Sequence, residues 1–337
     1  MVPLRISVIV PVHNALPYLA QSLESLAAQD LPASQFEIIA VDDGSTDGSG
    51  AWLDQFAARH RHVRVIHEPP SGAPGPPRNA GLAVATGQYI FFADADDVVG
   101  NETLRRLADF ADAHEADIVI PKLTPLGNRS LPESVYKKTV VDADLPTAFR
   151  TLFPQKLYRR GLLHAHQIRF QEGLRNFSDG LFNARAFVHA RRISIVTGYD
   201  YYFLREREDG GNVSLEPLEP ASYTRTVAAI CGIVRDHVDA DTAARVIADL
   251  YCRKCLNRYH RGRLSTYEPA RREAWVAAHS AFAREFVTDA MERGLKSPYR
   301  ERSELVRRGD TAALVALGEQ ELRQKHAGYP PVGSAEP

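Results

Sequence analysis

Cysteine is scarce in this sequence, with three residues among 337. Three thiols cannot build a disulfide framework, and such scarcity is typical of proteins that fold in a reducing compartment. An excess of one charge is also missing, because 41 Lys and Arg residues face 42 Asp and Glu residues and leave a formal net charge of -1. A chain this neutral has no overall attraction to nucleic acid, so we expect no nucleic-acid partner, and any polyanion site must be a local patch.

Long apolar runs are missing as well. The apolar stretch near the N-terminus is interrupted at Pro11 and lacks a signal-cleavage pattern. Nowhere does the sequence reach the roughly 18 consecutive apolar residues of a membrane-spanning helix. We therefore expect a cytoplasmic protein, a location that allows peripheral contact with the inner face of the membrane.

What the sequence does contain is an alternation of apolar β-branched runs with amphipathic segments. Its 44% hydrophobic and 25% charged residues are typical of a globular protein. This order predicts an α/β fold, a Rossmann-like open and mostly parallel sheet with helices on both faces. The expected strands are 5–12, 36–42, 63–67, 88–93, 116–121 and 193–196; the expected helices are 17–30, 47–60, 78–86, 102–113 and 179–190.

The composition changes near residue 220. Pro217 and Pro220 resemble a boundary, and a helical pattern follows them. We therefore expect an α/β domain over residues 1–220, a helical C-terminal region over 221–327 and a disordered tail over 328–337.

Four polar segments fall where expected parallel strands end, at residues 11–14, 42–47, 69–79 and 94–97. Ligands of open α/β sheets bind beyond the carboxyl ends of the strands. We therefore expect the fold to bring these four segments to one edge, although they are far apart in the sequence.

The last of these segments, Asp94-Ala95-Asp96-Asp97, carries three carboxylates in four residues. Hard oxygen ligands of this kind suit Mg²⁺ or Mn²⁺, which leave coordination positions open for phosphate oxygens. The alternative is that the carboxylates cap the next helix or are solvated.

The other segments favour a nucleotide. In the stretch 41–47 one of Asp42 and Asp43 can accept a hydrogen bond from a base while the other holds the turn. The glycine-rich stretch 71–81 permits close backbone approach to a ligand, and its Arg78 is a candidate for binding phosphate or carboxylate. A surface loop with a solvated arginine is the alternative for this stretch.

Taken together, the stretches IVPVHN, VDDGSTDGS, PPRNAGL and YIFFADADD resemble a family 2 inverting glycosyltransferase with the GT-A fold. The resemblance implies a nucleotide-sugar donor, usually a UDP-sugar, and a divalent metal, Mn²⁺ or Mg²⁺, held by Asp94 and Asp96. It also implies a set of donor-binding residues: Pro11, Val12 and Asp43 at the uracil, Asp94 at the ribose, and Asn14, Ser71, Gly72, Arg78, Asn79, Ala95 and Asp96 around them.

Within that family, FSDGLFNARAF and YDYYFLRE are similar to the teichoic-acid glycosyltransferases that modify ribitol-phosphate polymers. This resemblance implies that residues 1–220 form a catalytic domain and that a phosphate-bearing cell-envelope polymer is the acceptor. It also makes the helical region 221–327 a candidate for acceptor binding or for homo-oligomer formation. It also implies that Asp179 is the general base, although Ser178 stands where the family commonly has a second acid. The alternative for Asp179 is the N-cap of a helix.

The stretch 199–214 corresponds to a loop that family 2 enzymes often place near the diphosphate, which makes Arg205 and Arg207 donor-binding candidates. A salt-bridged edge loop is the alternative. The basic stretch 253–263 suits a polyanionic acceptor or an anionic membrane surface, but we favour a solvated helix face. Cys252 and Cys255 are interpreted as packing residues, because no second ligand pair accompanies them.

The sequence thus predicts a metal-dependent inverting glycosyltransferase that moves a sugar from a UDP-sugar to a hydroxyl of a teichoic acid or another cell-envelope polysaccharide. Glucose, N-acetylglucosamine and glucuronic acid remain open as donor sugars. The alternatives are a transferase acting on another glycan or a small molecule, and a nucleotide-binding scaffold with weak catalysis.

Overall fold

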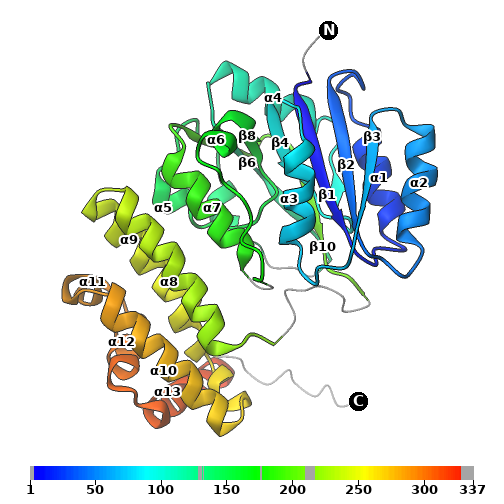
Figure 1. Ribbon diagram of the computed structural model, residues 1–337. Coiled ribbons are helices and arrows are strands. Elements are labelled where there is room, and N and C mark those ends of the chain that lie inside the picture. Colours follow the sequence, from blue (N-terminus) through cyan, green and yellow to red (C-terminus); the bar gives the residue numbers. More distant parts are fainter. Residues whose placement is uncertain (1–3, 128–130, 132, 175–176, 209–216, 328–337) are drawn as a thin grey trace, which may run out of the picture. The chain divides into compact units, whose positions relative to one another are not determined.

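The computed structural model describes the chain except residues 1–3, 128–130, 132, 175–176, 209–216 and 328–337. The predicted tail, 328–337, therefore lies outside the described residues. The chain divides into an N-terminal unit, Met1–Glu216, and a C-terminal unit, Pro217–Pro337. Figure 1 shows strands and helices in the first unit and helices in the second.

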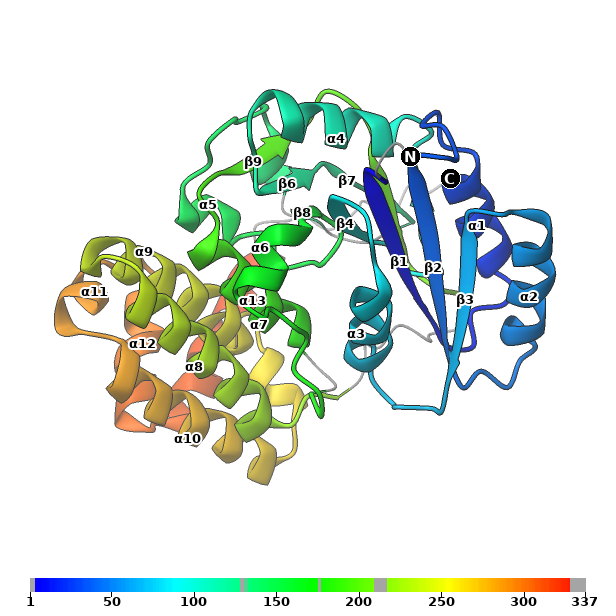
Figure 2. The same ribbon diagram turned by 45° about the horizontal axis from the view of Figure 1, so that its top comes forward.

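The N-terminal unit is built on a seven-stranded sheet in the order β3-β2-β1-β4-β8-β6-β9. Helices cover both faces of this sheet (Figures 1 and 2). β1 pairs in parallel with β2 and β4, and its apolar side chains are completely buried, as the β-branched run predicted. The strands are β1 (Ile6–Val12), β2 (Phe36–Asp43), β3 (Val63–Glu68), β4 (Tyr89–Phe92), β6 (Ile118–Pro121), β8 (Leu157–Arg159) and β9 (Ile193–Val196).

β8 is the exception to the parallel arrangement, because it lies antiparallel between β4 and β6. Phe91 near the end of β4 pairs with Leu157 at the start of β8. The residues just before β8 therefore lie beside the residues just after β4. This reversal brings residues 155 and 156 to the same sheet edge as Asp94.

A second, three-stranded sheet in the order β5-β10-β7 was not expected from the sequence. Its strands are β5 (Val98–Val99), β7 (Leu123–Leu126) and β10 (Tyr202–Arg205). β10 pairs antiparallel with β5, directly after the acidic segment 94–97. The first part of the stretch 199–214, predicted as a loop, is therefore a strand joined by backbone hydrogen bonds to the residues just after that segment.

Most expected helices are present, with shifted ends. α3 begins at Gly75, earlier than the predicted Arg78, because prolines fit the first turn of a helix. A Cβ at Gly81 would lie 2.5 Å from Cγ2 of Ile9, so α3 packs closely on β1. The helices and one 3-10 turn of this unit are α1 (Leu19–Ala27), α2 (Ser49–Arg59), α3 (Gly75–Val84), α4 (Thr103–Ala113), η1 (Glu133–Tyr136), α5 (Leu145–Ala148), α6 (Arg160–Ala165) and α7 (Ser178–His189).

The C-terminal unit is helical, as predicted, and its core contains Trp275, Tyr251 and Tyr259, each at most 1% exposed. Arg258 is buried with them, 4.0 Å from the ring centre of Trp275 and 4.6 Å from that of Tyr223. The elements of this unit are α8 (Pro220–His237), α9 (Ala240–Leu250), a π-helical turn η3 (Tyr251–Cys255), η4 (Leu256–Tyr259), η5 (Arg263–Thr266), α10 (Pro269–Phe286), α11 (Asp289–Gly294), α12 (Tyr299–Arg308) and α13 (Thr311–Ala327).

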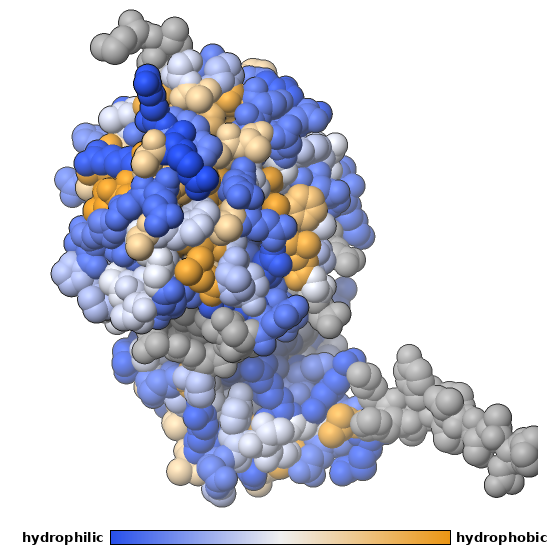
Figure 3. Space-filling view, turned by 90° about the vertical axis from the view of Figure 1, so that its right-hand side faces the viewer, coloured by the Kyte–Doolittle hydropathy of each residue, from blue (hydrophilic) through white to orange (hydrophobic). Residues whose placement is uncertain are grey.

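The surface on the α2 side of the N-terminal unit is mixed. Figure 3 shows small separate areas of apolar residues among hydrophilic ones on this face. Such scattered apolar residues are ordinary for a solvated protein surface.

Candidate functional site

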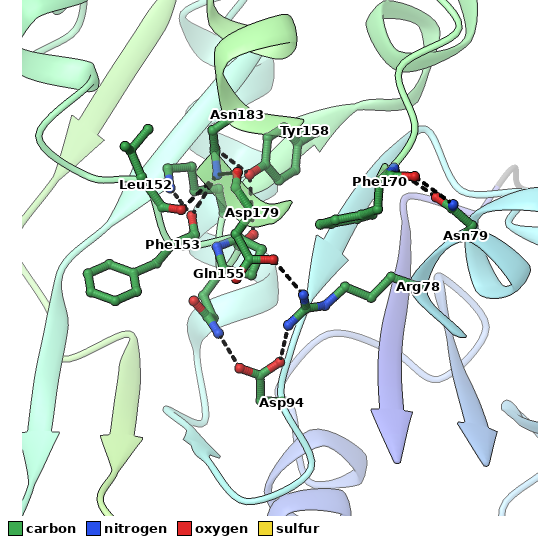
Figure 4. A network of polar contacts seen from close by, with 12 residues as sticks. Arg78, Asn79, Asp94, Leu152, Phe153, Gln155, Tyr158, Phe170, Asp179 and Asn183 are labelled. Atoms are coloured by element: carbon green, nitrogen blue, oxygen red, sulfur yellow. Dashed lines mark hydrogen bonds and ion pairs between the residues drawn. The ribbon is translucent and has the colours of Figure 1, made fainter. Parts of the chain in front are cut away.

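One arginine joins two carboxylates at the carboxyl edge of the sheet. Arg78, on the first turn of α3, donates through Nη1 to Oδ1 of Asp179 at 2.6 Å and through Nη2 to Oδ1 of Asp94 at 2.7 Å (Figure 4). The guanidinium is 3% exposed and lies 5.2 Å from the ring centre of Phe170. The fold therefore brings together the predicted donor-side residues Arg78 and Asp94 and the predicted base.

Asp179 does not cap a helix. α7 begins at Ser178, and its N-cap position is Phe177, so the Asp179 side chain is free of the capping role and points to Arg78. About a third of this side chain, 32%, is exposed. Burial, together with the charge of Asp94, raises the pKa of the Asp179 carboxyl, although the nearby Arg78 and Lys156 lower it. A carboxylate with a raised pKa is better suited to accept a proton from a hydroxyl group.

The carboxylates of the acidic segment 94–97 have two different functions. Asp97 is 3% exposed and accepts hydrogen bonds from the Tyr202 hydroxyl and the Arg205 backbone N–H, both at 2.7 Å. Burial, with the charges of Asp94 and Asp96, raises the pKa of Asp97 well above its usual range. Asp97 therefore holds the turn against β10, and Asp94 and Asp96 are left as the candidate metal ligands.

The donor set at this turn fits a divalent cation. Among the described residues, no group of three or more His, Cys, Asp and Glu side chains is placed to hold a metal. Mg²⁺ and similar ions, however, are commonly bound by one or two carboxylates together with substrate phosphates. Asp94 and Asp96 would supply two hard oxygen ligands to a cation that arrives with a diphosphate; in this structure both oxygens of Asp94 accept hydrogen bonds.

The two carboxylates at the end of β2 have different partners, and these show which one holds the turn. Asp42 holds the turn, because its Oδ1 accepts from the Ser45 N–H at 3.1 Å and its Oδ2 lies 3.1 Å from Nδ1 of His67. Asp43 accepts from the Ser71 N–H at 2.9 Å and from the Ser71 hydroxyl at 2.8 Å. Asp43 thereby joins β2 to the glycine-rich segment, and of the two it is the one facing the predicted nucleotide loops.

The remaining predicted nucleotide residues lie in these loops. Val12 is completely buried at the end of β1, beneath these loops. Asn14 has a φ of 47°, and its Oδ1 accepts from the Thr46 N–H at 2.8 Å, which ties the loop after β1 to the turn after β2. Pro11 is partly buried beside them, Gly72 has a φ of +75° and open space around it, and Ala95 is buried within the acidic turn.

Asn79 contacts backbone in this structure. Its Nδ2 donates to the Phe170 carbonyl and its Oδ1 accepts from the Phe170 N–H, both at 2.9 Å. The amide therefore fixes the segment around residue 170 to α3 and keeps the Phe170 ring against Arg78.

The two arginines of the predicted loop 199–214 enclose an aromatic ring. The guanidinium carbons of Arg205 and Arg207 lie 5.3 and 5.2 Å from the ring centre of Tyr18. Arg205 also donates to the Asp96 carbonyl at 2.7 Å, and Arg207 to the Asn14 carbonyl at 3.1 Å. Both arginines are thus beside candidate donor-binding residues; residues 209–214 of the predicted loop lie outside the described part of the chain.

Sequence reasoning missed several polar residues of this site. Gln155 and Lys156, directly before β8, are 3% and 1% exposed, and Gln155 Nε2 donates to Oδ2 of Asp94 at 2.6 Å. Burial lowers the pKa of Lys156 to about 7, although Asp179 raises it. The other two polar site residues that the sequence analysis did not identify are Asn183 and Tyr202. A polar Gln-Lys pair between Pro154 and an apolar strand was the one available signal, and it had no pattern that points to a site.

The basic stretch 253–263 is a solvated face only in part. Arg261 and Arg263 are exposed, as that interpretation expects. Arg258, however, is buried against aromatic rings, and Arg253 pairs with Asp249. Burial lowers the pKa of Lys254 to about 8. Part of this charge therefore belongs to the packing of the C-terminal unit. Cys255 is buried and Cys252 partly buried, in agreement with packing functions.

Comparison with known proteins identifies two families in the chain. Residues 7–166 match glycosyl transferase family 2, and residues 220–318 match the glycosyl transferase TarS linker domain. The chain belongs to glycosyl transferase family 2 and has the GT-A fold, as its motifs indicated.

Individual relatives agree with this assignment. The chain is 36% identical over 235 residues to the poly(ribitol-phosphate) beta-glucosyltransferase of Bacillus spizizenii, covering 69% of this chain and 37% of that protein. It is 35% identical over 229 residues to the poly(ribitol-phosphate) beta-N-acetylglucosaminyltransferase TarS of Staphylococcus aureus, covering 67% and 40%. The chain therefore spans less than half the length of these two relatives.

A solved structure extends the similarity to both units. The crystal structure of S. aureus TarS 1-349 in complex with UDP-GlcNAc matches with a TM-score of 0.85 and 28% identity, covering 96% of this chain and 92% of that one. Among the described helices of the present structure, none has the length and apolar character needed to cross a membrane.

Proposed function

We propose that this chain is a metal-dependent inverting glycosyltransferase that moves a sugar from a UDP-sugar to a hydroxyl of a poly(ribitol-phosphate) chain. The observation that carries the proposal is the shared arginine. Arg78 contacts both Asp94, a candidate donor-side residue, and Asp179, the candidate base, in a fold that matches a UDP-GlcNAc complex over 96% of its length.

The donor is proposed to lie across the loops after β1, β2 and β4. Asp43 faces these loops beside Ser71, where a carboxylate oxygen can accept a hydrogen bond from a base N–H. Glycine at position 72, with its positive φ, allows the backbone to approach the nucleotide closely. Donors with N-acetylglucosamine or glucose fit the names of the two relatives.

The reaction needs one base on the acceptor side. Asp179 accepts the proton of the acceptor hydroxyl while that oxygen attacks the anomeric carbon. The bond from the anomeric carbon to the diphosphate oxygen breaks at the same time, UDP leaves with the electron pair, and the configuration inverts. The Asp179 side chain is 32% exposed and its Oδ1 is held by Arg78, so Oδ2 is the oxygen that we propose to face the acceptor.

Mn²⁺ or Mg²⁺ is proposed to bind at Asp94 and Asp96. When bound, such an ion neutralises negative charge that develops on a departing diphosphate. The protein's own contribution is to hold Asp94 in place through Arg78 and Gln155.

Donor turnover tests this proposal. The full chain is incubated with UDP-glucose, UDP-N-acetylglucosamine or UDP-glucuronic acid, with Mn²⁺ and with or without poly(ribitol-phosphate), and UDP release is measured. We expect acceptor-dependent and Mn²⁺-dependent release with one of the first two donors. Binding of UDP without release from any donor would support a nucleotide-binding scaffold instead, and absence of UDP binding in Mn²⁺ would contradict the donor class.

An isosteric change tests the base. Asp179→Asn removes the proton acceptor, and we expect transfer to fall by about 1000-fold, since a positioned general base contributes roughly 100- to 10,000-fold. Calorimetry should find UDP affinity close to that of the unchanged protein. Asp109→Asn, on the exposed face of α4, is the matched control and should transfer normally. Equal activity of both variants would exclude Asp179 as the base.

A further inference from the structure

Three hydrogen bonds join Asp94 to other parts of the N-terminal unit. Its backbone N–H donates to the Tyr202 hydroxyl at 2.9 Å. Its Oδ1 accepts from Arg78 and its Oδ2 from Gln155. Because a carboxylate only accepts hydrogen bonds, the Gln155 side chain must present its NH₂ group to Asp94, so the orientation of that amide is fixed.

The backbone just before Gln155 is held in turn by a side chain of the helix that carries the base. Asn183 is completely buried one turn after Asp179 on α7. Its Nδ2 donates to the carbonyls of Leu152 and Phe153, both at 3.2 Å, and to the Asp179 carbonyl at 2.8 Å. Its Oδ1 accepts from the Tyr158 hydroxyl at 2.9 Å. Both ends of this amide are therefore used to join α7 to the segment 152–158.

These contacts form a closed ring, visible in Figure 4. One side runs from Asp94 through Arg78 to Asp179. The other side runs from Asp94 through Gln155, the backbone of segment 152–155 and Asn183 back to Asp179. We propose that Gln155 and Asn183 are positioning residues, which hold the donor-side carboxylate and the base at a fixed separation through this second connection.

The proposal rests on the proposed transferase function and deepens it. If Arg78 were the only link, the carboxylates of Asp94 and Asp179 could still turn about its guanidinium group. The second connection, through Gln155 and Asn183, restricts this rotation. A displacement of about 1 Å between reacting groups can cost roughly 100-fold in rate. The ring therefore acts on the chemical step, in which base and anomeric carbon must be aligned, and much less on donor binding.

Gln155→Met tests the ring, because it keeps the length of the side chain and removes the hydrogen bond to Asp94. We expect kcat for transfer to fall about 10- to 100-fold, while KM for the UDP-sugar and the calorimetric Kd for UDP change by less than about 3-fold. Gln88→Met is the matched control: Gln88 also donates to a carboxylate, that of Asp112, but at the surface. It should leave kcat unchanged.

Asn183→Ser breaks the same connection at α7, because it removes the hydrogen bonds to the segment 152–155. The double variant Gln155→Met/Asn183→Ser should lose no more kcat than the stronger single variant, because both changes break the same connection. If Asn183→Ser fails to fold, the Gln155→Met result decides alone. An unchanged kcat, a raised KM at normal kcat, or a kcat loss that matches a fall in melting temperature would overturn the proposal. Absence of transfer by the unchanged protein would instead count against the proposed function.

Discussion

Both units bury an arginine, but they surround it with different groups. Arg78 lies between two carboxylates that are 31% and 32% exposed, at the edge of the sheet. Arg258, in the C-terminal unit, lies against the rings of Tyr223 and Trp275. Carboxylates that keep part of their surface in solvent can also contact a ligand, whereas aromatic rings in a core cannot. The partners of these two arginines, more than their burial, thus distinguish the candidate site from a structural contact.

Of the two arginines, the one in the N-terminal unit should give the larger effect when it is removed. Arg78→Met leaves Asp94 and Asp179 without their shared cation, so the two carboxylates repel each other. We expect kcat/KM for transfer to fall at least about 100-fold. The free energy of unfolding, measured with urea, should fall by about 2 kcal/mol, because breaking a partly buried ion pair leaves uncompensated charge.

Arg78→Lys is the control for charge alone. A single ammonium cannot donate to two carboxylates in the fixed geometry of a guanidinium fork. We expect it to recover part of the lost stability and little of the activity. Full activity of the lysine variant would contradict the bridging function of Arg78.

A smaller effect, confined to stability, is expected in the C-terminal unit. Arg258→Met keeps most of the side-chain volume and loses the attraction of the cation to two rings, which is worth about 1–2 kcal/mol. The affinity for UDP should stay the same by calorimetry. Arg263→Met, at an exposed position, should change neither quantity. A weaker UDP affinity in Arg258→Met would remove the distinction between the two arginines.

The smallest effect concerns pH. Burial, with the charge of Arg258, lowers the pKa of His279 to about 3. An unfolded chain binds this proton below its ordinary pKa of about 6.5, while the folded chain does not, so folding loses stability as the pH falls from 6.5 toward 3. Between pH 7.5 and 5.5 the stability difference between the unchanged protein and His279→Gln should move by about 1 kcal/mol in favour of the variant. Urea unfolding at both pH values measures it, and a constant difference would contradict the low pKa.

Most of the parallel strands were predictable because they are apolar runs buried on both faces; β3, at the edge of the sheet, is shorter in apolar residues and only partly buried. β8 and the β5-β10-β7 sheet were not, because their strands have two to four residues and are set by neighbours rather than by their own pattern. The same limit applies at the site. Asp94, Arg78 and Asp179 belong to motifs, and the structure brings them into contact. Gln155 and Asn183 were not predicted as site residues, and their positions at the site depend on the antiparallel strand β8, which the sequence pattern does not predict.

The close packing of α3 on β1 has a consequence for tuning this protein. Gly81 is three residues after Arg78, and a methyl group there would meet Ile9 at 2.5 Å. Gly81→Ala would therefore lift the helix and withdraw the guanidinium from the carboxylates without changing any polar residue. Pairing that change with Ile9→Ala, which removes Cγ2, would return the space. The distance between this helix and the sheet therefore controls how far Arg78 reaches toward the carboxylates.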